Sequence, residues 1–173
     1  MNLAHLSLLA AALGLPAVIG IAAEAPPRTF VSAGREALVL GFDLLASFPY
    51  EVPGPAEASG AAASPAPKSL IPANVQAFNG RWAAVTGFML PLELKEGRAK
   101  QFVLVRNQAS CCYGLAPNLN EYVLVTMTGA GIRPEMDVPV TVVGTLKVGE
   151  TYEGGLLVGI YQLDGEQLTE LPR

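Results

Sequence analysis

The chain has 173 residues, of which 51% are hydrophobic and 15% charged, which is enough apolar mass for one modest core and argues against global disorder. The formal net charge is -4 at pH 7 and the lysines and arginines are scattered singly, so we do not expect a nucleic-acid site. The only histidine, His5, lies in the N-terminal apolar run, so the rest of the chain has none for Ser-His-Asp catalysis, for histidine-based zinc sites or for facial-triad iron.

Residues 6–23 carry no charge, and this apolar run predicts an export signal. Gly20-Ile21-Ala22 has the small-x-small pattern of a cleavage site, so we assign residues 1–23 to a signal peptide. A membrane anchor stays open as the alternative, because no lysine or arginine precedes the run and its length is near the lower limit of a membrane span. We therefore expect a periplasmic or otherwise exported protein, which is membrane-anchored if the leader is not cleaved.

Residues 24–52 follow as an N-terminal arm. Its apolar part, from Ala37 to Val52, predicts a short helix with Asp43 as N-cap, and we expect this part to be a peripheral flap. Residues 53–69, "PGPAEASGAAASPAPKS", are rich in Pro, Ala, Gly and Ser and predict a flexible linker. A fragment that begins near Ser69 is then expected to fold by itself.

Residues 70–165 predict the compact domain. "IPANVQAFNG", at 71–80, fits a short helix with Pro72 in its first turn and Gly80 at its end. Five runs rich in Val, Leu, Tyr, Phe and Thr predict strands at 81–90, 101–106, 121–128, 138–148 and 155–163, with "VGETYEGGL" as a hairpin connection. Glycines inside these runs are typical of small barrels, so the fold class expected is mainly β, a small five-stranded antiparallel OB-like barrel. A small sandwich is the alternative, and residues 166–173 form a tail.

Two stretches, "GFMLP" at 87–91 and "CCYGLAPNLNE" at 111–121, resemble a bacterial exported family of domains of unknown function. The resemblance covers roughly Phe42 to Ile160. It implies an export or lipoprotein signal and an OB-like β-barrel, and no biochemical activity comes with it. Some members carry a Cys-x-His pair where this chain has Cys111 and Tyr113, so a metal role that depends on histidine is not expected.

The two cysteines, Cys111 and Cys112, are adjacent in a loop between two predicted strands. Zinc normally requires four ligands, which argues against a zinc site. Copper or another soft metal accepts thiolates and thioethers, so Met89 and Met127 could assist the cysteines, although methionines more often pack in cores. A disulfide between neighbours is strained, because their Cα atoms are about 3.8 Å apart and ordinary disulfides need about 4.4–6.8 Å. Two reduced cysteines packed at the end of the barrel, or one exposed thiol, are the other possibilities.

The candidate site includes further side chains of this loop: Tyr113, Asn118, Asn120 and Glu121. These groups could line a polar pocket, but asparagines in such a sequence more often cap turns. Glu121 could also form a cross-strand ion pair with Arg81 or Arg106. Trp82, the single tryptophan, is expected to anchor the core or the barrel rim.

These observations favour an exported, non-enzymatic binding or accessory module that uses the Cys111–Glu121 loop to hold an envelope protein or a small ligand, without a cofactor. The alternative is a soft-metal handling or thiol-redox protein centred on Cys111 and Cys112, for which copper is the first candidate metal. A hydrolase is not favoured, because no histidine and no recognisable acid pair are present.

Overall fold

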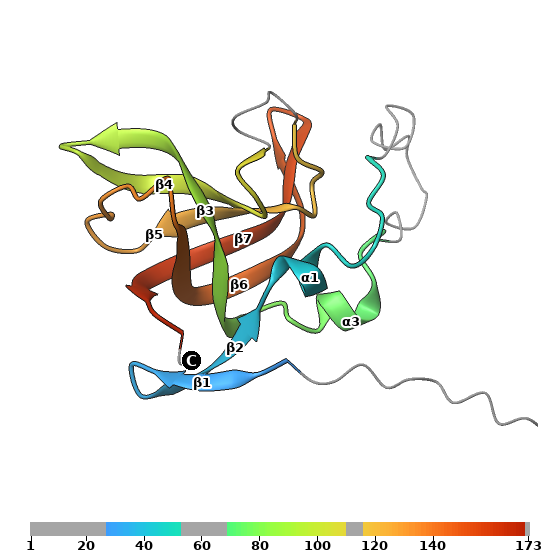
Figure 1. Ribbon diagram of the computed structural model, residues 1–173. Helices are drawn as coiled ribbons and strands as arrows, with labels where there is room; N and C mark the ends of the chain where they lie inside the picture. Colours follow the sequence, from blue (N-terminus) through green and yellow to red (C-terminus); the bar gives the residue numbers. More distant parts are fainter. Residues whose placement is uncertain (1–26, 53–68, 110–115, 172–173) are drawn as a thin grey trace, which may run out of the picture.

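The computed structural model describes residues 27–52, 69–109 and 116–171, and in these it is mainly β, with seven strands and two short helices (Figure 1). The elements in chain order are β1 (Thr29–Ser32), β2 (Arg35–Leu40), α1 (Phe42–Leu45), α3 (Ala73–Gln76), β3 (Arg81–Lys95), β4 (Arg98–Val105), β5 (Tyr122–Met127), β6 (Pro139–Glu153) and β7 (Leu156–Thr169). The five predicted strands are confirmed as β3 to β7.

The strands form one mixed sheet in the order β1-β2-β3-β4-β5-β7-β6, and β3 also pairs with β6. Five strands therefore close into a ring. The expected wholly antiparallel five-stranded barrel is wrong, because β5 and β7 are parallel and two further strands extend the sheet. The reason is topological: β6 pairs with β3, so β7 returns from the β6–β7 hairpin into the gap beside β5, where it runs in the direction of β5.

The N-terminal segment belongs to the core, and its expected role as a peripheral flap is wrong. β1 and β2 form a hairpin, and β2 pairs in parallel with β3 through Leu38–Leu40 against Ala83–Val85. Beyond β2, Phe42 and Leu45 are buried in the main hydrophobic cluster. A fragment that begins at Ser69 would lose these side chains as well as the edge contact of β3, so we no longer expect it to fold.

α1 begins differently from the prediction. Its N-cap is Gly41, not Asp43, and no side chain caps it. Asp43 lies in the first turn, where a carboxylate interacts favourably with the helix dipole. Its carboxylate fills the space that a Cβ at position 41 would need, which explains the glycine. α3 also begins one residue later than expected, with Pro72 as its N-cap.

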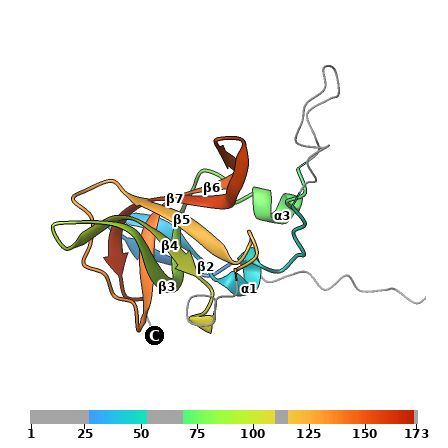
Figure 2. The ribbon, with the colours of Figure 1, turned by 90° about the horizontal axis from the view of Figure 1, so that it is seen from above.

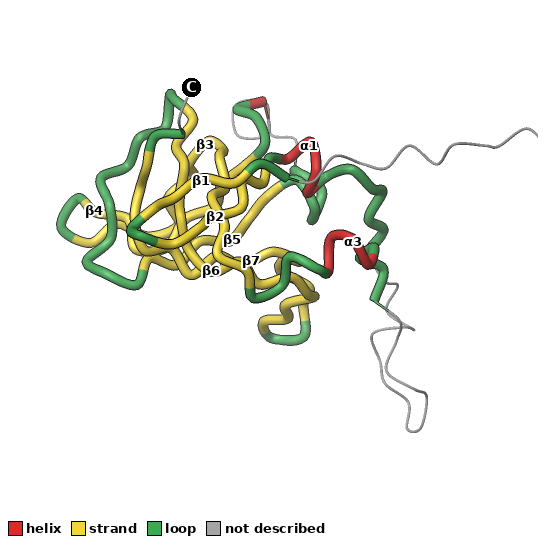
Figure 3. Tube along the Cα trace, turned by 90° about the horizontal axis from the view of Figure 1, so that it is seen from below, coloured by secondary structure: helices red, strands yellow, loops and turns green. Residues whose placement is uncertain are grey.

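A buried hydrogen bond fixes α1 to the barrel. The Tyr161 hydroxyl on β7 donates to the Leu45 carbonyl at 2.7 Å, and both residues are fully buried. α1 and α3 lie at the same end of the barrel (Figures 1 and 3). Burial raises the pKa of the Tyr161 hydroxyl above its usual value, because the charged phenolate would lose its hydration.

One carboxylate holds the chain on both sides of residues 53–68. Glu150, on β6, accepts a hydrogen bond from the Tyr50 hydroxyl at 3.4 Å and another from the Ser69 hydroxyl at 3.1 Å. Burial, followed by the charge of Glu150, raises the pKa of Tyr50. The predicted linker itself lies outside the described residues.

The β6–β7 hairpin is confirmed where the sequence predicted it. Gly154 and Gly155 connect the strands with φ of 57° and 82°, the left-handed geometry that two-residue hairpin turns require. Gly144 allows a close approach instead, because a Cβ there would collide with the carbonyl oxygen of Asp164. β7 continues to Thr169 and pairs with Thr141, so strand structure extends past residue 165, where the sequence had placed the start of a tail.

Trp82 anchors a second, smaller cluster, as expected. It is buried together with Ala37, Ala84 and Val143. The Arg35 guanidinium lies 4.0 Å from the centroid of the indole ring, a cation–π contact that fixes the β1–β2 hairpin on β3.

We expect Leu45→Ala to lower the free energy of unfolding by about 2–5 kcal/mol, because it removes a fully buried side chain and leaves a cavity. Val52→Ala, at a side chain that is 63% exposed, is the control and should change it by less than about 0.5 kcal/mol. Urea unfolding of the three proteins measures both values. Equal midpoints would show that the N-terminal segment does not contribute to the core.

Tyr161→Phe should lower the free energy of unfolding at pH 7 by about 1–3 kcal/mol, because the Leu45 carbonyl loses its donor. The pKa of Tyr161 is higher in the folded than in the unfolded state, so its hydroxyl contributes full stability below about pH 10 and loses it as the pH rises further. The difference between wild type and variant should therefore shrink at pH 11. Urea unfolding at both pH values measures it, and a constant difference would contradict the assignment.

Candidate functional site

The predicted site loop connects β4 to β5, and the structure describes its two ends, residues 106–109 and 116–121. Cys111, Cys112 and Tyr113 lie outside the described residues. Their predicted roles in packing, metal binding or redox chemistry therefore stay predictions. The described ends can be assessed from their contacts.

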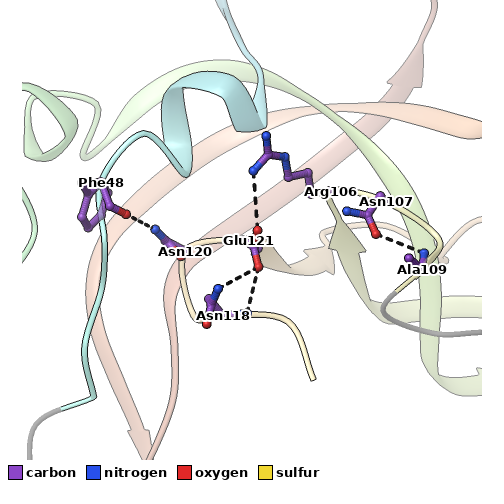
Figure 4. Close-up of polar contacts among 7 residues, drawn as sticks. All are labelled: Phe48, Arg106, Asn107, Ala109, Asn118, Asn120 and Glu121. Atoms are coloured by element: carbon purple, nitrogen blue, oxygen red, sulfur yellow. Dashed lines mark hydrogen bonds and ion pairs between the residues drawn. The ribbon is translucent and has the colours of Figure 1, made fainter. Parts of the chain in front are cut away.

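Asn118 and Glu121 close a turn at the start of β5 (Figure 4). The Glu121 carboxylate accepts hydrogen bonds from the Asn118 side-chain amide at 3.0 Å and from its backbone N–H at 3.2 Å. The Glu121 N–H donates back to the Asn118 carbonyl at 2.8 Å. The side chain that bonds the turn backbone is therefore that of Glu121, and the Asn118 amide supports it instead of capping the turn itself.

Glu121 also pairs across the strands with Arg106, as one of the two predicted partners, and Figure 4 shows the contact. The Arg106 Nη1 lies 3.5 Å from the Glu121 Oε1, and the Arg106 N–H donates to the Glu121 carbonyl at 3.1 Å. The Arg106 side chain is about half exposed, so this ion pair adds little stability. Together with the backbone hydrogen bond, it holds the two described ends of the loop side by side.

Asn120 connects the loop to the N-terminal segment. It is only 4% exposed, and its side-chain amide donates to the Phe48 carbonyl (Figure 4). A shallow depression of about 370 Å³ lies between residues 46–50 and the Asn118–Glu121 turn. Because Asn118, Asn120 and Glu121 are all engaged with the protein itself, they shape this depression and have little capacity left for a ligand.

The methionines of the predicted soft-metal alternative are core residues. Met89 and Met127 are buried within the main hydrophobic cluster, which confirms that they pack in the barrel. Within the described ranges, no three His, Cys, Asp or Glu side chains gather as they would around a metal ion. The soft-metal hypothesis therefore depends on Cys111 and Cys112 and stays a prediction.

The structure shows a second candidate site that the sequence did not predict. Two hairpin arms, residues 91–100 of β3–β4 and residues 149–157 of β6–β7, extend from the barrel (Figure 2). Between them, a hollow of about 210 Å³ lies over β4, β5 and β7 and includes Leu92 from one arm and Glu153 from the other. A second hollow, of about 350 Å³, continues along the β3–β4 arm. Gln101 and Thr126 line both hollows, so the two form one elongated depression, which we call the arm groove.

Three polar side chains line the arm groove without an internal partner among the described residues. Gln101, Thr126 and Gln162 make no side-chain hydrogen bond within this part of the chain. Two carboxylates beside them form ion pairs within the protein: Asp164 with Lys147 at 2.6 Å, and Glu93 with Lys95 at 3.3 Å. The parallel register of β5 and β7, Leu124 against Gln162, brings these residues together, and no signal in the sequence indicates that pairing.

A wider groove of about 840 Å³ lies between the start of β6 and the C-terminal segment, with Glu135 and Glu170 on its walls. Two of its lining hydroxyls, of Thr86 and Thr141, bond to each other at 2.8 Å. The amides of the arm groove have no such internal partners. We therefore take the arm groove as the better candidate.

We expect Asn120→Ala to lower the free energy of unfolding by about 1–3 kcal/mol, because it removes the buried Asn120 amide and leaves the partly buried Phe48 carbonyl without its donor. Asn118→Ala, at an exposed turn, should lower it by less than about 1 kcal/mol. Chemical denaturation of both variants measures the difference. A larger loss for Asn118→Ala would show that the turn, and not the contact with Phe48, holds the loop.

Comparison with known proteins places the chain in a family. A crystal structure of a DUF3299 family protein from Pseudomonas aeruginosa PAO1 is similar, with 29% identity and a TM-score of 0.49 over 57% of this chain and 66% of that chain, just under two thirds of it. No curated protein matches. No helix in the described ranges is long and apolar enough to cross a membrane. Residues 56–170 match the family described as Protein of unknown function (DUF3299), and the chain belongs to this family.

Proposed function

We propose that the protein is an exported, non-enzymatic binding module whose ligand lies in the arm groove. The observation that carries the proposal is the contrast between two sets of polar side chains. Each of Asn118, Asn120 and Glu121 makes a side-chain hydrogen bond within the protein, whereas the groove-lining side chains of Gln101 and Gln162 make none in the described part of the chain. Unpartnered amides on a groove floor are free to bond a ligand.

The strand order supports an OB-like assignment of the barrel. The ring β3-β4-β5-β7-β6 closes through the β3–β6 pairing. An OB fold is a five-stranded Greek-key barrel that binds chain ligands on its second and third strands, between the loop of strands 1 and 2 and the loop of strands 4 and 5. In this chain the corresponding elements are β4, β5 and the two arms, which border the arm groove. This support is an analogy at the level of the fold.

The lining of the first hollow favours a neutral, polyhydroxylated chain such as a glycan. Side-chain amides and a hydroxyl both donate and accept hydrogen bonds, as sugar hydroxyls and N-acetyl groups do. Leu92 and Leu124 add apolar surface against which a sugar ring can pack. The first hollow, of about 210 Å³, is smaller than the roughly 300–1,000 Å³ of pockets that enclose drug-sized molecules, which is consistent with a chain ligand that contacts it with only one ring.

The lining of the first hollow disfavours nucleic acid. It has the carboxylates of Glu153 and Asp164 and no lysine or arginine, whereas Lys95, Arg98 and Lys100 line the second hollow beside Glu93. A phosphate backbone requires clustered positive charge, and the chain carries a net charge of -4. An exported location, which the apolar N-terminal run predicts, would bring the groove into contact with the glycans of the cell envelope.

We expect the protein to bind a soluble N-acetylglucosamine hexamer and the double variant Gln101→Ala/Gln162→Ala to bind it at least tenfold more weakly. The physical reason is that the variant removes the two amides that face the ligand while leaving the hydrophobic core unchanged. Isothermal titration calorimetry of both proteins measures the dissociation constants.

Gln167→Ala is the matched control, because Gln167 is a glutamine of the same strand whose amide bonds Ser32 at 2.6 Å and lies outside the groove lining. It should leave the affinity unchanged. A thymidine oligomer of similar length should not bind. If the hexamer does not bind, or if all three proteins bind it equally, the arm groove is not a glycan site; preference for the oligonucleotide would show that the ligand class is wrong.

A further inference from the structure

The β3–β4 arm has an open strand edge. β3 pairs with β6 only as far as Phe88 against Pro139, and from Met89 to Lys95 it pairs with β4 alone. In the described part of the chain, the opposite edge of this segment therefore has no strand beside it. Figure 1 shows the arm projecting away from the barrel. An edge of this kind can accept another strand.

Backbone groups at the centre of this segment point toward the open edge. Ala99, on β4, bonds Ile132 through both its N–H and its carbonyl, at 2.8 and 2.9 Å, so its backbone groups point away from β3. Leu94 is the residue opposite Ala99. In an antiparallel ladder, two opposite residues that do not hydrogen-bond to each other both direct their N–H and C=O away from the partner strand. The N–H and C=O of Leu94 are therefore available at the open edge.

The side chains along this edge are complementary to the same side chains of a second copy of the chain. Leu94 is 56% exposed, and its neighbours Glu93 and Lys95 form an ion pair at 3.3 Å on the other face of the strand. If a second copy pairs antiparallel about a two-fold axis at Leu94, Leu94 lies opposite Leu94, and each Glu93 lies opposite Lys95 of the other copy. Opposite charges directly across a strand pair are favourable.

We propose that two copies of the chain associate through this edge, with Leu94 at the two-fold axis and Glu93 and Lys95 of both copies in one four-charge cluster. A two-fold contact of this type is closed, so it produces dimers and not fibres. The ladder is short, because Pro91 has no N–H and the β3–β4 register shifts both between Pro91 and Glu93 and between Glu93 and Leu94, beside the axis, and these features limit strand addition. The dimer is therefore weak and forms reversibly with concentration.

Charge exchange between copies tests the proposal. In Glu93→Lys both facing positions are positive, and in Lys95→Glu both are negative, so each variant should dimerise at least fivefold more weakly than wild type. In an equimolar mixture of the two variants, every lysine faces a glutamate of the other copy. The mixture should therefore form a heterodimer within about twofold of the wild-type dissociation constant, measured by sedimentation equilibrium at low salt.

The mixture separates contacts between copies from contacts within one copy, because the internal pair of Glu93 and Lys95 is lost in both variants. Arg133→Glu, an equal charge change at an exposed position outside this edge, is the control and should leave dimerisation unchanged. Thermal melts verify that all variants are folded. A wild type that stays monomeric at millimolar concentration, or a mixture that associates no better than its components, would overturn the proposal. Glu93 and Lys95 also line the second hollow of the arm groove, so the dimer is judged by sedimentation of these variants, and the glycan site is judged by calorimetry of Gln101→Ala/Gln162→Ala.

Discussion

The length of β3 is the constraint on which the rest of the structure depends. Its first half pairs with β2 on one side and with β6 on the other, and its second half pairs with β4. The pairing with β6 closes the ring, and the pairing with β2 recruits the N-terminal segment into the core. Because β3 continues to Lys95, beyond the last residue that β6 can reach, it also creates the arm that borders the groove.

The two candidate sites differ in how far the protein satisfies its own polar groups. The turn at Asn118 and the buried amide of Asn120 hold the loop against the N-terminal segment, so their hydrogen bonds serve the architecture. In the arm groove the strand backbones are paired, but the outward amides of Gln101 and Gln162 are not. A rigid floor with free polar groups is the arrangement that binding surfaces commonly use.

Sequence patterns predicted the local features of the fold and missed those that arise from distant pairing. Alternation and strand-forming residues located β3 to β7, and the glycine pair located the β6–β7 hairpin. β2 was missed because its partner in β3 lies far along the chain, and a parallel pairing leaves no turn between the strands to reveal it. Asp43 was misassigned because aspartate is favoured both at the N-cap and in the first turn of a helix, so the residue type does not distinguish the two positions. The loop polar residues were identified, but the groove requires the register of β5 against β7, which alternation does not define.

The anchoring of Tyr50 and Ser69 on a single carboxylate couples two segments that lie far from Glu150 in the sequence. Both hydroxyls bond the same side chain of β6, so neither contact is independent of the other. A substitution that removes the Glu150 carboxylate releases Tyr50 and Ser69 together, and one change on β6 therefore acts on both segments at once.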